Sequence, residues 1–150
     1  MKLLRFNLNH GPRSMSRHGV LLGGGRVVDL RKAAARYLAD VKGDIQGVEI
    51  AALRLPSDMV KLLQIGAPAW ELIDETLAWV DGLDDADAAT GLDGSKILSP
   101  FSECSLHAPV RRPGKAIAVG RNYSEHREEM GNVLPTKVLA SWIKATSAII

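Results

Sequence analysis

The sequence predicts an α+β fold, with a small N-terminal domain over residues 1–104 and the start of a second unit over residues 105–150. Short apolar runs bounded by glycine are typical of strands, and longer segments repeat apolar residues at the spacing of a helix face. Between the two parts, residues 81–95 shift to Asp, Ala and Gly, which is typical of a solvated linker. The 150 residues, 46% of them hydrophobic and 24% charged, have the composition of a globular protein with a buried core.

The first elements form a strand, a hairpin and a helix. Residues 2–6 predict a strand and residues 7–16 a loop. Residues 19–22 and 26–30 are apolar runs joined by three glycines, which predicts a β-hairpin. The glycines lack both the Lys-Ser/Thr ending of a phosphate loop and the spacing of a dinucleotide fingerprint. Asp29 is placed to cap a helix over residues 30–41, whereas residues 43–55 fit strand or helix and are left unassigned.

Two more helices are expected before the linker. Ser57 is placed to cap a helix over residues 58–65, and Pro68 suits the first turn of a helix over residues 69–80. One side of the second helix carries apolar side chains that we assign to the core rather than to a cofactor site: Trp70, Ile73, Leu77 and Val80. The aspartates of residues 81–95 lack the glycine and glutamate positions of an EF-hand, so no calcium site is predicted there.

The C-terminal part opens with two strands, over residues 105–110 and 116–119. Ser124 is placed to cap a short helix over residues 125–130, and Gly131 suits its C-terminal end. A last strand is expected over residues 141–150. The predicted order is therefore strand, turn, short helix and strand.

His126 and Glu129 are three positions apart on the predicted short helix and therefore project from one face. A carboxylate that accepts a hydrogen bond from one imidazole nitrogen leaves the other nitrogen free to take a proton from water. The pair is thus a candidate water-activating base. The alternative is a solvated surface pair, which is common at this spacing.

The run GRNYSEHREEMG, followed by Pro135 and WIKATSAII, resembles the signature of the fumarylacetoacetate hydrolase family, G-x-N-Y-x-x-H-x-x-E and then a proline and an aromatic-x-Lys segment. Its matching residues are Gly120, Asn122, Tyr123, His126 and Glu129. The N-terminal stretches MKLLRF, HGVLLGGGRVVDL and PSDMVKLLQIG resemble the small N-terminal domain of many bacterial members. The resemblance implies that residues 105–150 are the opening strands and helix of a β-rich catalytic domain.

The resemblance also implies an activity: metal-dependent hydrolysis of a carbon–carbon bond in a diketo acid, such as an acylpyruvate or fumarylacetoacetate-like compound. A divalent metal, Mg, Mn or Ca, would chelate the 2-oxo acid in the complete fold. His126 would be the base and Glu129 its orienting partner. Lys144, Arg121 and Tyr123 would lie on the substrate side, although Tyr123 also suits a purely structural role in the turn.

The metal-binding carboxylates of the family, a Glu-x-Glu pair and an Asp, come after the lysine segment and are not among these 150 residues. We therefore expect the isolated chain to bind no metal tightly, to be inactive, and to associate through its uncovered last strand. Two alternatives stay open: a hydratase, decarboxylase or lyase of related 2-oxo acids, or a non-catalytic truncated fragment that acts as an interaction module. A complete catalytic domain would be expected to form a homodimer.

The net charge and the cysteine content indicate which classes of partner and which cellular compartment to expect. A net charge of +2 predicts no nucleic-acid partner, and the basic group Arg111, Arg112 and Lys115 lacks interleaved aromatic residues. Cys104 is the single cysteine, which fits a reducing, cytoplasmic location and an inert core thiol. No run approaches the roughly 20 apolar residues of a membrane span, so no membrane partner is expected.

Overall fold

The computed structural model describes residues 1–9, 16–111, 113–120, 131, 140–145 and 147. The chain divides into two compact units, Met1–Val110 and Arg111–Ile150. From the sequence, the boundary lies somewhere from residue 99 to residue 114, and residue 104 is taken as the end of the first domain. In the structure residues 104–107 form a strand that pairs with the first strand of the chain, so they belong to the first unit.

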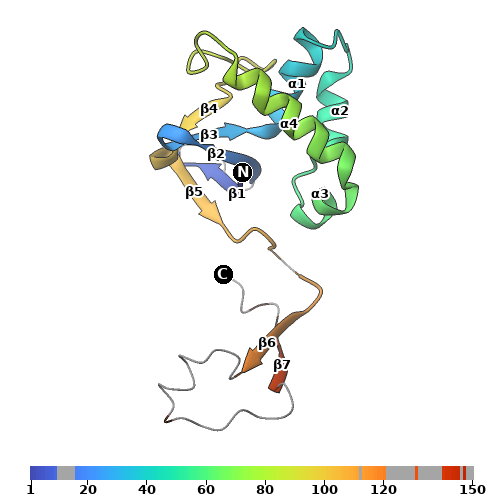
Figure 1. The fold of residues 1–150 in the computed structure, drawn as a ribbon, viewed down its shortest axis with the longest axis vertical. Coiled ribbons are helices and arrows are strands. Elements are labelled where there is room, and N and C mark those ends of the chain that lie inside the picture. The colour runs from blue at the N-terminus through green and yellow to red at the C-terminus, as the bar shows by residue number, and fades with distance from the viewer. Residues whose placement is uncertain (10–15, 112, 121–130, 132–139, 146, 148–150) are drawn as a thin grey trace. The chain divides into compact units, whose positions relative to one another are not determined.

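Among the described residues of the first unit, five antiparallel strands form one sheet (Figure 1). They are β1 (Lys2–Leu8), β2 (Arg17–Leu22), β3 (Arg26–Asp29), β4 (Leu98–Pro100) and β5 (Cys104–His107), in the order β4-β3-β2-β1-β5. The predicted hairpin is confirmed as β2 and β3. Its glycine connection is required by geometry, because Gly24 and Gly25 have φ values of 72° and 69° that side chains rarely tolerate.

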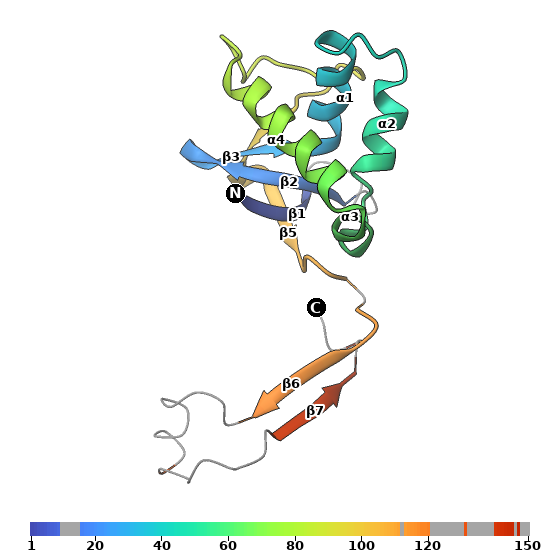
Figure 2. The ribbon, with the colours of Figure 1, turned by 45° about the vertical axis from the view of Figure 1, so that its right-hand side comes forward.

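Helices cover one face of this sheet (Figure 2). In the described part of the first unit they are α1 (Leu30–Asp40), α2 (Gly47–Arg54), α3 (Met59–Ile65) and α4 (Ala67–Asp81). The predicted cap of α1 is confirmed, since the Asp29 carboxylate accepts a hydrogen bond from the Lys32 N–H at 3.3 Å. The helix after Pro68 is also confirmed, and the unassigned region contains α2. The structure therefore has the predicted α+β class.

The predicted cap of α3 is wrong by one residue. Asp58 caps this helix, accepting a hydrogen bond from the Lys61 N–H at 2.9 Å, and Ser57 lies before it. The capping side chain bonds an N–H three residues further along the chain. Because α3 begins at Met59, only Asp58 has the right spacing to that N–H.

The main core lies between the helices and the sheet. It is built from buried apolar side chains of β2 and all four helices, including Val20, Leu30, Leu38, Ala51, Leu62, Leu72 and Ile73. On α4, Ile73 and Val80 are buried as predicted, whereas Trp70 and Leu77 pack against the core with part of their surface exposed. Trp70 therefore contributes to packing, as the sequence indicates.

On the opposite face of the sheet, Phe6 and Val27 are buried over Gly19. A Cβ atom at Gly19 would lie 2.7 Å from Phe6 Cε1, 2.8 Å from Val27 Cγ1 and 2.7 Å from the Val28 carbonyl oxygen. Gly19 is required here because two side chains and a neighbouring strand approach its Cα closely.

The solvated linker expected over residues 81–95 is only partly correct. Its aspartates are exposed, but Leu83, Ala86 and Ala89 pack against a second core cluster that contains Val80 and Ile97. The segment is also closed by hydrogen bonds from Gly91 N–H to Ser95 O at 2.8 Å and from Ile97 N–H to Ala89 O at 3.2 Å. It therefore folds back on the first unit and leads into β4, which was not predicted.

The described part of the second unit contains an antiparallel ribbon of β6 (Ala116–Gly120) and β7 (Ala140–Lys144). The strand predicted over residues 116–119 is confirmed. The strand predicted over residues 141–150 is confirmed as far as Lys144, while Ala145 and Ser147 are not in a strand. The short helix predicted over residues 125–130 lies outside the described residues.

None of the helices that the structure describes is both long enough and apolar enough to cross a membrane. The longest, α4, has 15 residues. Its buried face packs on the core of the first unit.

Candidate functional site

The reactive groups predicted from sequence belong to the second unit. His126, Glu129, Arg121 and Tyr123 lie outside the described residues, so the structure does not place them. Lys144 is described as the last residue of β7, where its side chain is exposed. The ribbon of β6 and β7 is therefore the part of the predicted site that the structure describes.

The register of the ribbon fixes how its strands meet residues 121–139. Gly120 pairs with Ala140, so β6 ends beside the point where β7 begins. Lys144 pairs with Ala116, at the other end of the ribbon. Four residue steps of about 3.3 Å separate it from Ala140, or about 13 Å along the strand. The ribbon thus keeps the Lys144 backbone well away from the two points where residues 121–139 attach.

The two faces of the ribbon carry different side chains. Trp142 and Lys144 alternate with Ile143, so they share one face and Ile143 lies on the other. Ile143 pairs with Ile117, and these two side chains are 71% and 66% exposed. A two-stranded ribbon is marginally stable in water by itself. Its exposed isoleucines show that the described residues leave this apolar face uncovered.

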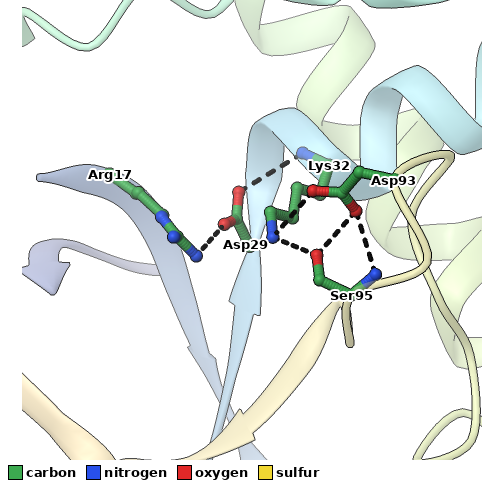
Figure 3. Close-up of polar contacts among 5 residues, drawn as sticks. All are labelled: Arg17, Asp29, Lys32, Asp93 and Ser95. Carbon is green, nitrogen blue, oxygen red and sulfur yellow. Dashed lines mark hydrogen bonds and ion pairs between the residues drawn. The ribbon is translucent and has the colours of Figure 1, made fainter. Parts of the chain in front are cut away.

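The first unit contains a polar network, here defined as Arg17, Asp29, Lys32, Asp93 and Ser95 (Figure 3). At one end, Arg17 Nη1 lies 3.1 Å from Asp29 Oδ2, and Asp29 also caps α1 through the Lys32 N–H. Asp29 is only 4% exposed, and this desolvation raises the pKa of its carboxyl group above the usual value. The hydrogen bond from Lys32 and the charge of Arg17 act in the opposite direction.

At the other end of the network, the Lys32 ammonium contacts both Ser95 and Asp93. Lys32 Nζ donates a hydrogen bond to Ser95 Oγ and lies 3.2 Å from Asp93 Oδ2. Asp93 Oδ1 accepts from the Ser95 hydroxyl at 2.6 Å and from the Ser95 N–H at 3.0 Å. These hydrogen bonds, the hydroxyl one foremost, and the nearby ammonium lower the pKa of Asp93 to about 2.

A serine hydroxyl beside a lysine amine is an arrangement that some nucleophilic enzymes use, with the neutral amine as base. Here Lys32 Nζ donates to the Ser95 oxygen, and the Ser95 hydroxyl donates its proton to Asp93 Oδ1, so the amine is not placed to accept that proton. The network instead joins β2, the first turn of α1 and the segment before β4. We assign it a structural role.

Sequence reasoning missed this network because its members are far apart along the chain. The one local signal is the run Asp93-Gly94-Ser95, which is typical of a turn in which an aspartate bonds backbone two residues on. Gly94 has a φ of 75°, a conformation that glycine adopts readily. That run predicts the turn but not its partner on α1.

Metal ligands and a reactive thiol are the two other kinds of reactive group to consider in the described part of the chain. Among the described residues, no three or more His, Cys, Asp and Glu side chains come together closely enough to hold a metal ion. Cys104 is partly buried, and that burial, with a smaller effect of Glu103, raises the pKa of its thiol. A raised pKa makes a cysteine a poor nucleophile at neutral pH, in agreement with an inert thiol.

Comparisons of the chain with models of known protein families and with curated protein sequences found no match. The resemblance to the fumarylacetoacetate hydrolase family therefore depends on the sequence motifs alone.

Proposed function

We propose that this chain carries the catalytic base of a metal-dependent hydrolase that cleaves a carbon–carbon bond in a diketo acid. The observation that carries the proposal is the run from Gly120 to Gly131, which holds His126 and Glu129 in the register of the fumarylacetoacetate hydrolase signature. The apolar run that precedes it forms the predicted strand, β6. The antiparallel pairing of β6 with β7 is compatible with it.

In this proposal Glu129 accepts a hydrogen bond from one imidazole nitrogen of His126. The other nitrogen takes a proton from water, and the resulting hydroxide attacks the distant carbonyl of the substrate. The carbon–carbon bond then breaks, which leaves a carboxylic acid and an enolate that regains a proton. Arg121 and Lys144 are the candidate partners of a substrate carboxylate, and Tyr123 is a candidate for shaping the substrate side.

A divalent cation, Mg, Mn or Ca, would supply charge stabilisation for the enolate in the complete family fold. The residues that the structure describes do not provide its ligands. The 150 residues contain no Glu-x-Glu pair, and the described residues contain no acidic cluster that suits a cation. The metal is accordingly not assigned to any residue of this chain.

The remaining parts of the proposal concern partners and location. The substrate would be a small 2-oxo acid rather than a nucleic acid or a membrane lipid, and the complete enzyme would act as a homodimer. A cytoplasmic location is proposed because Cys104, the single cysteine, precludes an intramolecular disulfide.

The test is an acylpyruvate absorbance assay on the product of the full open reading frame, with manganese added. We expect hydrolysis, and a decrease in turnover of about 100-fold or more for His126→Gln, the usual effect of removing a general base. His107→Gln is the matched control, because this histidine is exposed on β5 in the other unit. Absence of turnover on acylpyruvates and related 2-oxo acids would refute the proposal. Where turnover occurs, identifying the products distinguishes a hydrolase from a hydratase, decarboxylase or lyase.

A second candidate function is a non-catalytic interaction module. It is favoured by the apolar ribbon face that Ile117 and Ile143 leave exposed. The coding sequence after codon 150 discriminates the two functions: an in-frame Glu-x-Glu within a few tens of codons supports the enzyme, and a stop codon at that point supports the module.

A further inference from the structure

A group of basic side chains lies at the end of the sheet beside the loop that connects α2 to α3. We define this basic cluster as Arg5, His18 and Arg31. Arg5 on β1 pairs directly with His18 on β2, so their side chains lie on the same face of the sheet. Arg31 in the first turn of α1 donates two hydrogen bonds, of 3.1 and 3.0 Å, to the Leu55 carbonyl of the loop. Figure 2 shows α3 beside the ends of β1 and β2.

Neither arginine of the basic cluster has a carboxylate partner among the described residues. Arg5 donates to Ser16 Oγ at 3.0 and 2.6 Å and to the Ala108 carbonyl at 3.3 Å, and all these acceptors are neutral. The acceptor for Arg31 is also neutral. Three of the other described arginines of this unit do pair with acids, Arg17 with Asp29, Arg26 with Asp87, and Arg36 with Asp40, whereas the exposed Arg54 does not. The basic cluster thus contains two guanidinium groups that form no ion pair with a described carboxylate.

His18 is the buried member of the basic cluster. It is 5% exposed, and neither ring nitrogen forms a hydrogen bond of ordinary geometry with a described residue. Burial lowers the pKa of His18, the Pro56 carbonyl nearby opposes this, and the charges of Arg5 and Arg31 lower the pKa further. Asp58 is the acidic group that acts in the opposite sense, and its carboxylate already caps α3.

Guanidinium groups that have no acidic partner and keep spare N–H donors are well suited to bind a carboxylate or phosphate group. A guanidinium has five N–H donors. The hydrogen bonds of Arg31 involve Nε and Nη2 only, and both arginines are partly exposed. We propose that Arg5, His18 and Arg31 form a binding site for a small oxyanion, either a carboxylate or a phosphate group. The proposal is independent of the function proposed above, because it involves only the first unit.

The test follows the His18 imidazole by NMR in the full 150-residue chain. The probes are sodium sulfate, which stands in for a phosphate group, and sodium pyruvate, which presents a carboxylate. Each replaces sodium chloride at constant ionic strength, so that general screening does not change. His18→Gln identifies the His18 resonance. We expect saturable binding of at least one probe and a rise in the His18 pKa when it binds, because an adjacent anion favours the imidazolium.

Two variants of Arg31 and one control complete the experiment. Arg31→Gln should weaken binding about tenfold or more, and Arg31→Lys, which keeps the charge but loses the planar fork, should weaken it by a smaller factor. If far-UV circular dichroism shows that Arg31→Gln does not fold, the binding measured for Arg31→Lys decides whether Arg31 contributes to the site. Arg26→Gln removes the same charge from an arginine paired with Asp87 and should leave binding unchanged within about twofold.

The two probes distinguish a phosphate site from a carboxylate site. Binding of sulfate alone assigns the site to phosphate groups, and binding of pyruvate alone assigns it to carboxylates. Failure of both probes to saturate would overturn the proposal. Equal weakening by the Arg26 and Arg31 variants would also overturn it, because binding would then reflect net charge only.

Discussion

Gly19→Ala should be among the most destabilising single substitutions in the first unit. The added Cβ would meet Phe6 Cε1 and the Val28 carbonyl oxygen at 2.7 Å, and Val27 Cγ1 at 2.8 Å. Overpacking a core typically costs about 1–3 kcal/mol, and more where the obstacle does not move. The Val28 oxygen belongs to the backbone of the neighbouring strand, so relief would require β2 and β3 to separate. We therefore expect a loss of about 3 kcal/mol in the free energy of unfolding.

The measurement is urea unfolding of the 150-residue chain followed by far-UV circular dichroism. For a unit of this size, such a loss lowers the Tm by roughly 12–24 °C, at 4–8 °C per kcal/mol. Gly23→Ala is the matched control, because a Cβ there would meet nothing within 4 Å and the residue does not have a positive φ. We expect the control to change stability by less than about 1 kcal/mol.

A double mutant separates the steric argument from other causes. Leucine has no atom at the position of Phe6 Cε1, so Phe6→Leu should remove one of the three close contacts. Gly19→Ala should therefore cost less in the Phe6→Leu background than in the parent chain. Unfolding of Gly19→Ala within about 0.5 kcal/mol of the parent would refute the reasoning.

Three other predictions concern the cap of α3, pH and activity. Asp58→Ala should cost about 1 kcal/mol in urea unfolding, the usual effect of losing a helix cap, while Ser57→Ala should be near neutral; the reverse order would contradict the assigned cap. Because burial holds the pKa of His18 below 6.5, the unfolded chain takes up the proton first as the pH falls, so stability should decrease from about pH 6.5 downward; His18→Gln should flatten the Tm profile in that range, and an unchanged slope would argue against it. The isolated 150-residue chain should bind manganese weakly in calorimetry and hydrolyse no acylpyruvate, and micromolar binding together with turnover would show that the metal ligands lie within it.

The elements that sequence reasoning predicts correctly are those fixed by local chemistry. The glycine connection of the β2–β3 hairpin, the Asp29 cap of α1 and the helix after Pro68 each depend on a few adjacent residues. The position of the α3 cap was missed by one residue, because Ser57 and Asp58 are both good capping residues and only the start of the helix distinguishes them.

The features that escaped prediction depend on contacts between distant parts of the chain. β4 has three residues and pairs with β3 only after α4 and the following segment have folded back. The contact of Lys32 with Asp93 likewise joins positions that no local pattern connects. For the candidate site, the sequence identifies His126 and Glu129 by type and spacing, and both lie outside the described residues.

The order of strands in the sheet has a consequence for synthesis of the protein. The meander β1-β2-β3 is complete at Asp29, but its two outer edges pair with β5 and β4, which end at His107 and Pro100. At about 5–20 residues per second, a ribosome needs roughly 4–16 s to travel from residue 29 to residue 107. During this interval both edges of the nascent meander have unpaired N–H and C=O groups, which are open to pairing with another chain. The newly made protein is therefore most prone to aggregate before residues 98–107 leave the ribosome, and a chaperone that shields strand edges would act in this interval.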